Sequence, residues 1–134
     1  MDLLLTFRLA EGCYALPLEQ VQEVVEAPRL HFLPRAPTGF LGAINFHGSI
    51  VPVLDLVAHL GLTGDRRDPR LVVLTPERCA VALAVTTVLQ VVPAAADEAA
   101  GEGRAPGEAG EGIELLDVEW LRESLERLIK GTGG

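Results

Sequence analysis

The chain has few of the residues on which nucleic-acid binding and catalysis depend. Of its 134 residues only 4% are aromatic, and its net charge at pH 7 is −8. Nucleic-acid binding needs a positive surface, and base stacking needs aromatic side chains on that surface. The sequence also lacks a Gly-X-Ser-X-Gly elbow, a phosphate-binding loop and a His-Glu-X-X-His motif. We therefore expect no nucleic-acid partner and no enzymatic activity.

Cysteine is nearly absent as well. Cys13 and Cys79 have no partner at the spacing of metal ligands, and each lies in an apolar, strand-like context. Buried free thiols are the expected state of both. The three histidines, His31, His47 and His59, are each isolated in the sequence. We therefore expect no metal site and no cofactor.

The sequence has no apolar run long enough to cross a membrane, although 49% of its residues are apolar. The longest run, Cys79–Val92, is interrupted by Thr86 and Gln90, and it is shorter than the ~20 residues that a spanning helix needs. The N-terminus carries Asp2 and Arg8 and lacks a basic leader. These features predict a cytoplasmic chain with no direct membrane insertion.

Half of the negative charge lies in one segment, Ala94–Gly112. Its nineteen residues include seven alanines, five glycines and four glutamates, and its net charge is −4. It has no large apolar side chain to bury, so ordering it gains little free energy. This composition predicts a flexible loop and leaves the rest of the chain only mildly acidic.

The clearest positive signal is a β-hairpin followed by a short helix. Gly42–Phe46 and Ser49–Leu54 are apolar and rich in β-branched residues, and only His47-Gly48 separates them. Two-residue spacing with a glycine is typical of a tight hairpin turn. Asp55 then precedes Leu56–Leu60, where its carboxylate is suited to cap the first turn of a helix.

The remaining segments alternate between short strands and turns. Further strands are expected at residues 3–9, 13–18, 21–26, 71–75, 79–85, 88–92 and 113–116. A C-terminal helix is expected over Val118–Lys130, because its apolar residues recur at helical spacing. Asp117 is expected to cap this helix and Gly131 to end it.

The hairpin segment resembles the signature of the CheW family, the adaptors of bacterial chemotaxis arrays. In that family Gly-X-X-Asn-X-Arg-Gly is followed by Ile-Val-Pro-X-X-Asp-Leu, and Tyr14–Val25 is similar to the family's first hairpin. The matching signature positions here are Gly42, Asn45, His47, Gly48, Ile50, Val51, Pro52, Asp55 and Leu56. The chain departs from the family in two respects: His47 stands where an arginine is usual, and the second half is shorter.

The resemblance implies a mainly β fold of two pseudo-symmetric, five-stranded, SH3-like β-barrel lobes, with short helices and a C-terminal helix. Weak similarity between Cys13–Val25 and Cys79–Val92 agrees with such an internal repeat. We expect one CheW-like domain over residues 1–134, with a shortened second lobe. The expected parts are lobe 1 at about 12–62 plus C-terminal elements, lobe 2 at about 1–11 and 70–117, the loop at 94–112 and the helix at 118–130.

The resemblance also implies a function. A CheW-like chain is a non-catalytic adaptor that couples the cytoplasmic helical tip of a chemoreceptor (a methyl-accepting chemotaxis protein) to the regulatory domain of a CheA-type histidine kinase. Such a chain is recruited to membrane receptor arrays through these partners. Two alternatives stay open: a divergent CheW-like scaffold of a non-chemotaxis or pilus-motility system, and a small ligand-binding β-barrel protein.

Family positions nominate a set of partner-binding residues, each with a structural alternative. Val21 is equally suited to core packing, Glu23 to an ordinary surface charge, and Gly42 to a backbone that needs a small residue. Asn45 is placed to hydrogen-bond the hairpin turn, and Asp55 and Asp117 are expected to be helix caps. The candidate partner-binding residues are Val21, Glu23, Gly42, Asn45, His47, Val88 and Val91.

Overall fold

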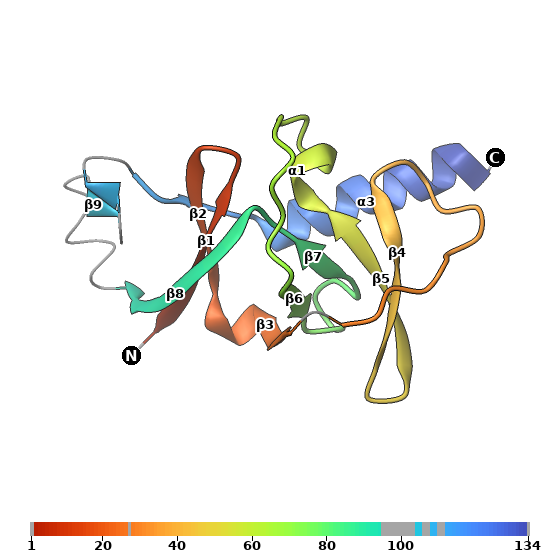
Figure 1. Cartoon of the computed structure of the whole chain (residues 1–134), viewed down its shortest axis with the longest axis horizontal. Coiled ribbons are helices and arrows are strands. Elements are labelled where there is room, and N and C mark those ends of the chain that lie inside the picture. The colour runs from red at the N-terminus through yellow and green to blue at the C-terminus, as the bar shows by residue number, and fades with distance from the viewer. Residues whose placement is uncertain (1, 27, 95–103, 106–107, 110–111, 134) are drawn as a thin grey trace.

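Two β-sheets form the body of the computed structural model, which describes residues 2–26, 28–94, 104–105, 108–109 and 112–133. The first sheet has the strand order β11-β2-β1-β8, and the second has the order β3-β6-β7-β5-β4. Figure 1 shows the two sheets next to each other, with helix α3 running along the second. β9 and β10 form a separate two-stranded sheet.

The first sheet is built from both ends of the chain. β1 and β2 form a hairpin around a two-residue turn, because Leu9 pairs with Gly12. β8 lies antiparallel to the other side of β1, and β11 lies parallel to β2. The strands are β1 (Leu3–Leu9), β2 (Gly12–Pro17), β8 (Thr87–Pro93) and β11 (Glu114–Leu115).

The second sheet takes its strands from the middle of the chain. The β4–β5 hairpin forms one edge, and β7 joins it to β6 by lying parallel to β5 and antiparallel to β6. A short helix, α1, follows β5 directly. The elements are η1 (Leu18–Gln20), β3 (Val21–Val25), β4 (Phe40–Phe46), β5 (Ser49–Asp55), α1 (Leu56–His59), β6 (Leu71–Leu74) and β7 (Ala82–Ala84).

One large hydrophobic core joins the two sheets and α3. A smaller core lies on the other face of the second sheet, around Ile44 and Val53. β6 supplies both cores, since successive side chains of a strand point to opposite faces: Val72 belongs to the large core and Val73 to the small one. The large core includes Phe7, Leu9, Leu16, Leu54, Leu56, Val57, Val72, Leu74, Leu83, Leu121 and Leu125.

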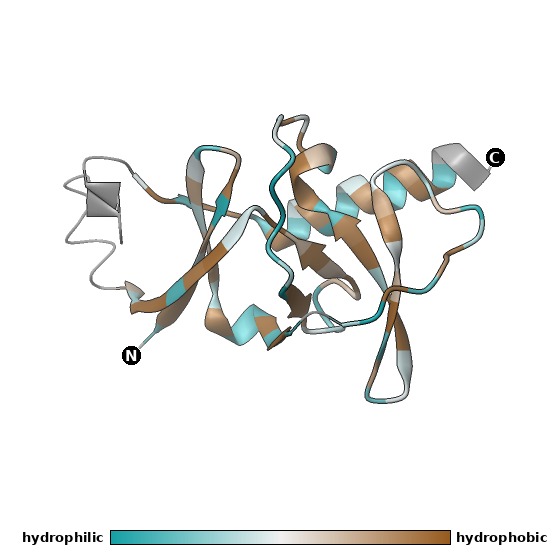
Figure 2. Cartoon of the chain, viewed as in Figure 1, coloured by the Kyte–Doolittle hydropathy of each residue, from teal (hydrophilic) through white to brown (hydrophobic). Residues whose placement is uncertain are grey.

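Helix α3 (Val118–Gly133) packs one apolar side on this core. Leu121 and Leu125 are buried, whereas Trp120 and Ile129 are exposed, so hydrophilic and hydrophobic bands alternate along the helix in Figure 2. The helix begins where Asp117 Oδ1 accepts the N–H of Trp120 at 3.1 Å, as expected for its cap. It continues past the expected end at Gly131 to Gly133. Glycine has a low helix propensity but can still adopt the helical conformation.

The expected mainly β fold is confirmed, with two main sheets and few helices. Residues 12–17 pair with residues 3–9 in the first sheet, and residues 71–84 join the second sheet. A tight turn at Ala10–Glu11, where Ala10 has a positive φ of 56°, joins β1 to β2. This turn folds β2 back on β1 and keeps both strands in one sheet.

Much of the segment 94–112, expected to be a flexible loop, lies outside the described residues. Within the described part, β9 (Arg104–Ala105) pairs antiparallel with β10 (Glu108–Ala109). Among the residues that the structure describes, no helix combines the length and the hydropathy needed to cross a bilayer.

Candidate functional site

The turn of the β4–β5 hairpin presents His47 at the surface. His47 and Gly48 both have positive φ, 50° and 87°, which is the geometry of a type I′ turn. Asn45 Oδ1 accepts the N–H of Gly48 at 3.0 Å and so fixes the turn. Asn45 therefore makes the hydrogen bond to the hairpin turn that its position in the sequence predicts. His47 is held in a conformation that few non-glycine residues adopt.

Glu23 and His47, which are 24 positions apart in the sequence, meet at this turn. His47 Nε2 lies 3.3 Å from Glu23 Oε1, and the two side chains are 71% and 46% exposed for His47 and Glu23 respectively. The ring of Phe46 packs against the His47 ring with centroids 4.3 Å apart. The pair joins the hairpin to β3 and leaves both polar groups accessible to a partner.

Beside this pair the surface has an apolar depression of about 390 Å³. Ile50 stands at its rim and is 66% exposed. We call Glu23, His47, Ile50 and this depression the hairpin face. The depression is lined by Gln22, Phe46, His47, Ser49, Ile50, Val51, Val73, Leu74, Pro76 and Ala80. Its size and lining suit one large apolar side chain of a partner, with polar groups at the edge.

Gly42 serves the backbone of β4. A side chain there would place Cβ 2.6 Å from the carbonyl oxygen of His31. His31 and Ala43 form a β-bridge with N–O distances of 2.7 and 2.9 Å. The φ of Gly42 is 148°. Close approach of the 28–38 loop therefore accounts for glycine at this position.

The three candidate valines do not gather at the hairpin face. Val21 is half-buried and packs against the large core. Val88 is buried, and Val91 is 47% exposed. Both lie on β8 in the other sheet. The structure thus unites Glu23, Asn45 and His47 and leaves Val88 and Val91 elsewhere.

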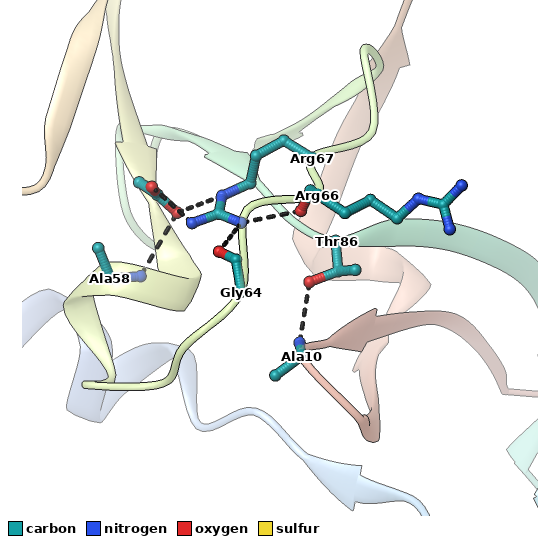
Figure 3. Close-up of polar contacts among 7 residues, drawn as sticks. Ala10, Ala58, Gly64, Arg66, Arg67 and Thr86 are labelled. Atoms are coloured by element: carbon teal, nitrogen blue, oxygen red, sulfur yellow. Dashed lines mark hydrogen bonds and ion pairs between the residues drawn. The ribbon is translucent and has the colours of Figure 1, made fainter.

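Asp55 has a partner that its sequence context did not indicate. As expected for a cap, its Oδ1 accepts the N–H of Ala58 at 3.4 Å. Arg67 also binds both carboxylate oxygens, at 2.9 and 3.1 Å. Figure 3 shows Arg67 reaching from the α1–β6 connection to this carboxylate, with Gly64 and Arg66 carbonyls on its other side. Arg67 therefore ties the connection to the end of β5.

Asp68 and Arg70 tie the same connection to the first sheet. Asp68 Oδ2 accepts the N–H of Val88 at 2.8 Å, and Arg70 Nη2 donates to the carbonyl of Val88 at 3.2 Å. Arg70 also binds both oxygens of Asp68, at 3.0 and 2.8 Å. Burial alone raises the pKa of Asp68, but the hydrogen bonds from Arg70 and Val88 and the Arg70 charge outweigh it and lower the pKa to about 2.

Cys79, His59 and Ser124 are packed or hydrogen-bonded within the fold. Burial raises the pKa of Cys79 to about 11, so its thiol stays protonated at neutral pH. His59 Nε2 lies 2.9 Å from Ser124 Oγ. The Ser124 hydroxyl donates to the carbonyl of Leu121 at 2.9 Å, so His59 is the donor in this pair, and burial lowers its pKa. Among the described residues, no three His, Cys, Asp or Glu side chains are grouped to hold a metal.

The two sheets and the exposed hairpin face define a small, mainly β module with an open surface site. The chain belongs to the CheW family, since the model of the CheW-like domain matches residues 3–121. It is also similar to a solved structure described as the scaffolding protein TtCheW from Thermoanaerobacter tengcongensis. The TM-score is 0.61 at 28% identity, over 69% of this chain and 64% of that one.

Two curated relatives match shorter segments. Protein FrzA of Myxococcus xanthus is 38% identical over 64 residues, which are 48% of this chain and 40% of the relative. The probable chemotaxis protein CheW of Rhizobium etli is 30% identical over 59 residues, which are 44% of this chain and 38% of the relative. The chain thus matches less than half the length of either relative.

Proposed function

We propose that this chain is an adaptor of chemotaxis-type signalling that couples a chemoreceptor tip to a CheA-type histidine kinase. The family match and the likeness to a scaffolding protein support an adaptor role. The work of an adaptor is positional, since it holds two proteins together so that a conformational change in one biases the other. In this proposal the chain acts in the cytoplasm and reaches membrane arrays through its partners.

The hairpin face is the observation that carries this proposal. It combines an exposed Ile50, an apolar depression and the Glu23–His47 pair. An amphipathic helix binds by placing apolar side chains in such a depression and polar ones at its edge. The helical tip of a receptor has this form.

A second candidate is a scaffold of a different chemotaxis-type system. The observation that favours it is the match to protein FrzA, which is 38% identical over 64 residues. The two candidates differ in whether the chain recruits a kinase to a chemoreceptor.

Co-sedimentation with a receptor cytoplasmic fragment, with and without CheA, tests the proposal. We expect the kinase to sediment with the receptor only when this chain is present. If the chain binds neither protein, the adaptor proposal is wrong. If it binds the kinase and no chemoreceptor fragment, the second candidate is favoured.

The residue to test first at the hairpin face is His47. We predict that His47→Glu weakens partner binding about tenfold, because it places a carboxylate beside Glu23 at the rim of the depression. Binding is measured by calorimetric titration, and the fold is checked by circular dichroism. His47→Asn is the matched control, since asparagine tolerates positive φ and adds no charge. Equal affinities of wild type and His47→Glu for both partners would contradict the prediction.

A further inference from the structure

One long segment of this acidic chain has no acidic residue. The chain has 19 Asp and Glu residues, yet none lies between Glu26 and Asp55. The same segment carries Arg29 and Arg35. Within the described residues, neither arginine side chain forms an ion pair with a carboxylate. The segment between Glu26 and Asp55 therefore carries a charge of +2 from these two arginines, in contrast to the net charge of −8 of the protein.

Large apolar side chains are exposed within this positive segment. Phe32 is 86% exposed, Leu41 is 48% exposed and Leu30 is 46% exposed. Phe32 and Leu41 line one depression of about 280 Å³ together with Arg35. Leu30 adjoins it, since Leu30 Cβ lies 3.7 Å from the position that a Cβ on Gly42 would take. We call Leu30, Phe32, Arg35 and Leu41 the Phe32 patch.

The backbone at Arg35 is strained. Arg35 follows Pro34 in a turn and has a φ of 59°. The second central position of a turn with positive φ is normally glycine or asparagine. An arginine here costs conformational free energy and brings a cation to the depression. Stability alone would favour glycine at this position.

The Phe32 patch is separate from the hairpin face. The patch lies at the start of β4, at Leu41, whereas His47 follows the end of the same strand. A strand rises about 3.3 Å per residue, so the two sites are on the order of 20 Å apart. In Figure 1 the loop that precedes β4 and the β4–β5 turn lie at different ends of that strand.

We propose that the Phe32 patch docks an acidic amphipathic segment of a partner protein. A large apolar side chain of that segment enters the depression beside Phe32 and Leu41, and its carboxylates pair with Arg29 and Arg35. Charge complementarity favours this occupant. The rest of the protein is acidic and repels an acidic segment, whereas Arg29 and Arg35 attract it. Two arginines fall short of the four to eight basic residues, roughly, that a lipid-binding cluster contains.

Two helical peptides with the same leucine pattern test this proposal, one with glutamates and one with lysines at its polar positions. Each is titrated into the ¹⁵N-labelled full chain, and amide shifts are followed by NMR. We expect the glutamate peptide to shift residues 29–42 and the lysine peptide to shift none of them. Equal binding of both peptides, or binding to phosphatidylserine vesicles in place of the glutamate peptide, overturns the proposal.

Variants separate binding from folding. Phe32→Ser is expected to lower the affinity for the glutamate peptide at least tenfold. Arg35→Gly is expected to lower this affinity several-fold. It is also expected to raise the thermal midpoint of unfolding, because glycine adopts the positive φ of position 35 without strain. Leu115→Ser is the matched control, since Leu115 is 54% exposed on β11. If Arg35→Gly binds like wild type, the arginine has no docking role and the proposal fails.

The peptide assay is also independent of receptor coupling. His47→Glu is expected to leave the affinity for the glutamate peptide unchanged, because it lies at the other end of β4. Loss of peptide binding in His47→Glu would show that the hairpin face and the Phe32 patch form one binding site, and it would overturn the proposal of a separate site. If the chain does not co-sediment with the receptor fragment but still binds the glutamate peptide, the adaptor proposal is wrong and the Phe32 patch proposal stands.

Discussion

Asp55 and Asp117 each cap the N-terminus of a helix, but within the described part of the chain only Asp55 has an additional arginine partner. Asp55 caps α1 and also binds Arg67 through both oxygens. Asp117 caps α3 through the N–H of Trp120. Asp55 is only 9% exposed, so its removal leaves the Arg67 guanidinium, itself partly buried, without its carboxylate.

We therefore predict a larger loss of stability for Asp55→Ala than for Asp117→Ala. Loss of a cap alone costs about 1 kcal/mol, and this is the value expected for Asp117→Ala. Asp55→Ala loses the charge-assisted pair as well, and we expect about 2–3 kcal/mol. Urea unfolding at pH 7 measures both. Equal losses would mean that the Arg67 pair adds nothing to the cap.

Asp68 makes the stability depend on pH. Its pKa falls from 3.8 to about 2 in the folded state. A carboxyl with a lowered folded pKa stabilises the fold above its unfolded pKa, and this contribution is lost as the pH falls through the folded value. For Asp68 the contribution is fully present above about pH 5 and declines between about pH 4 and 2, and the shift corresponds to about 2 kcal/mol.

We predict that Asp68→Asn is less stable than wild type at pH 7 and that this difference shrinks toward pH 2.5. Urea unfolding across this pH range measures it. Asp65→Asn is the control, because Asp65 is an exposed carboxylate in the same connection. A difference between wild type and Asp68→Asn that is constant with pH would show that the Asp68 charge does not stabilise the fold.

At the scale of single residues, the sequence predicts contacts between near neighbours but not contacts between distant segments. Asn45 was predictable as a turn residue because its acceptor and the Gly48 N–H are three residues apart. The Glu23–His47 pair was not predictable as a contact, since it depends on β3 and the β4–β5 turn meeting in three dimensions. Arg67 lay in a polar connection where nothing in the sequence distinguished it from Arg66.

At the scale of elements, β4 is held by the loop before it as well as by β5. The His31–Ala43 bridge brings the loop backbone against the strand at Gly42. Because a carbonyl oxygen occupies the space of a Cβ, a side chain at Gly42 requires the loop to move.

We predict that Gly42→Ala loses about 2–3 kcal/mol of stability, through both the clash and the positive φ. Gly64→Ala is a matched control: Gly64 has a φ of 131°, and nothing lies within 4 Å of a Cβ built there. We expect this control to lose about 1 kcal/mol from backbone strain alone. The comparison uses thermal and urea unfolding, and equal losses would exclude the close approach at His31 as the cause.

The strands were predictable and their partners only partly so. The two-residue spacing at His47-Gly48 specified the β4–β5 hairpin, and the observed pairing of Phe46 with Ser49 agrees. The parallel pairs β5–β7 and β2–β11 join strands that are distant in the sequence. No local turn specifies such pairs, so their placement in the two sheets could not be inferred from spacing.

At the scale of the molecule, the two sheets share one core. Phe7 and Leu16 of the first sheet belong to the same cluster as Leu54 and Leu83 of the second. Leu121 of α3 belongs to it as well. The Asp68–Arg70 contacts with Val88 add a polar connection between the sheets. The two sheets therefore depend on each other for burial.

We predict that the chain unfolds in one cooperative transition. Differential scanning calorimetry is expected to give equal calorimetric and van't Hoff enthalpies. Leu121→Ala, at a fully buried position, is expected to lower the single midpoint without dividing the transition, since truncation of a buried leucine costs about 2–5 kcal/mol. Two separated transitions in either protein would show that the sheets are independent units.

The order of strands in the chain sets the order in which the sheets can be completed during synthesis. Every strand of the second sheet lies between residues 21 and 84. The first sheet needs residues 3 to 115. On the ribosome the β1–β2 hairpin therefore emerges before the second sheet but waits for β8 and β11, while the second sheet already has all its strands. β1 and β2 are thus made before every strand of the second sheet, yet their outer edges are paired only after that sheet has all of its strands.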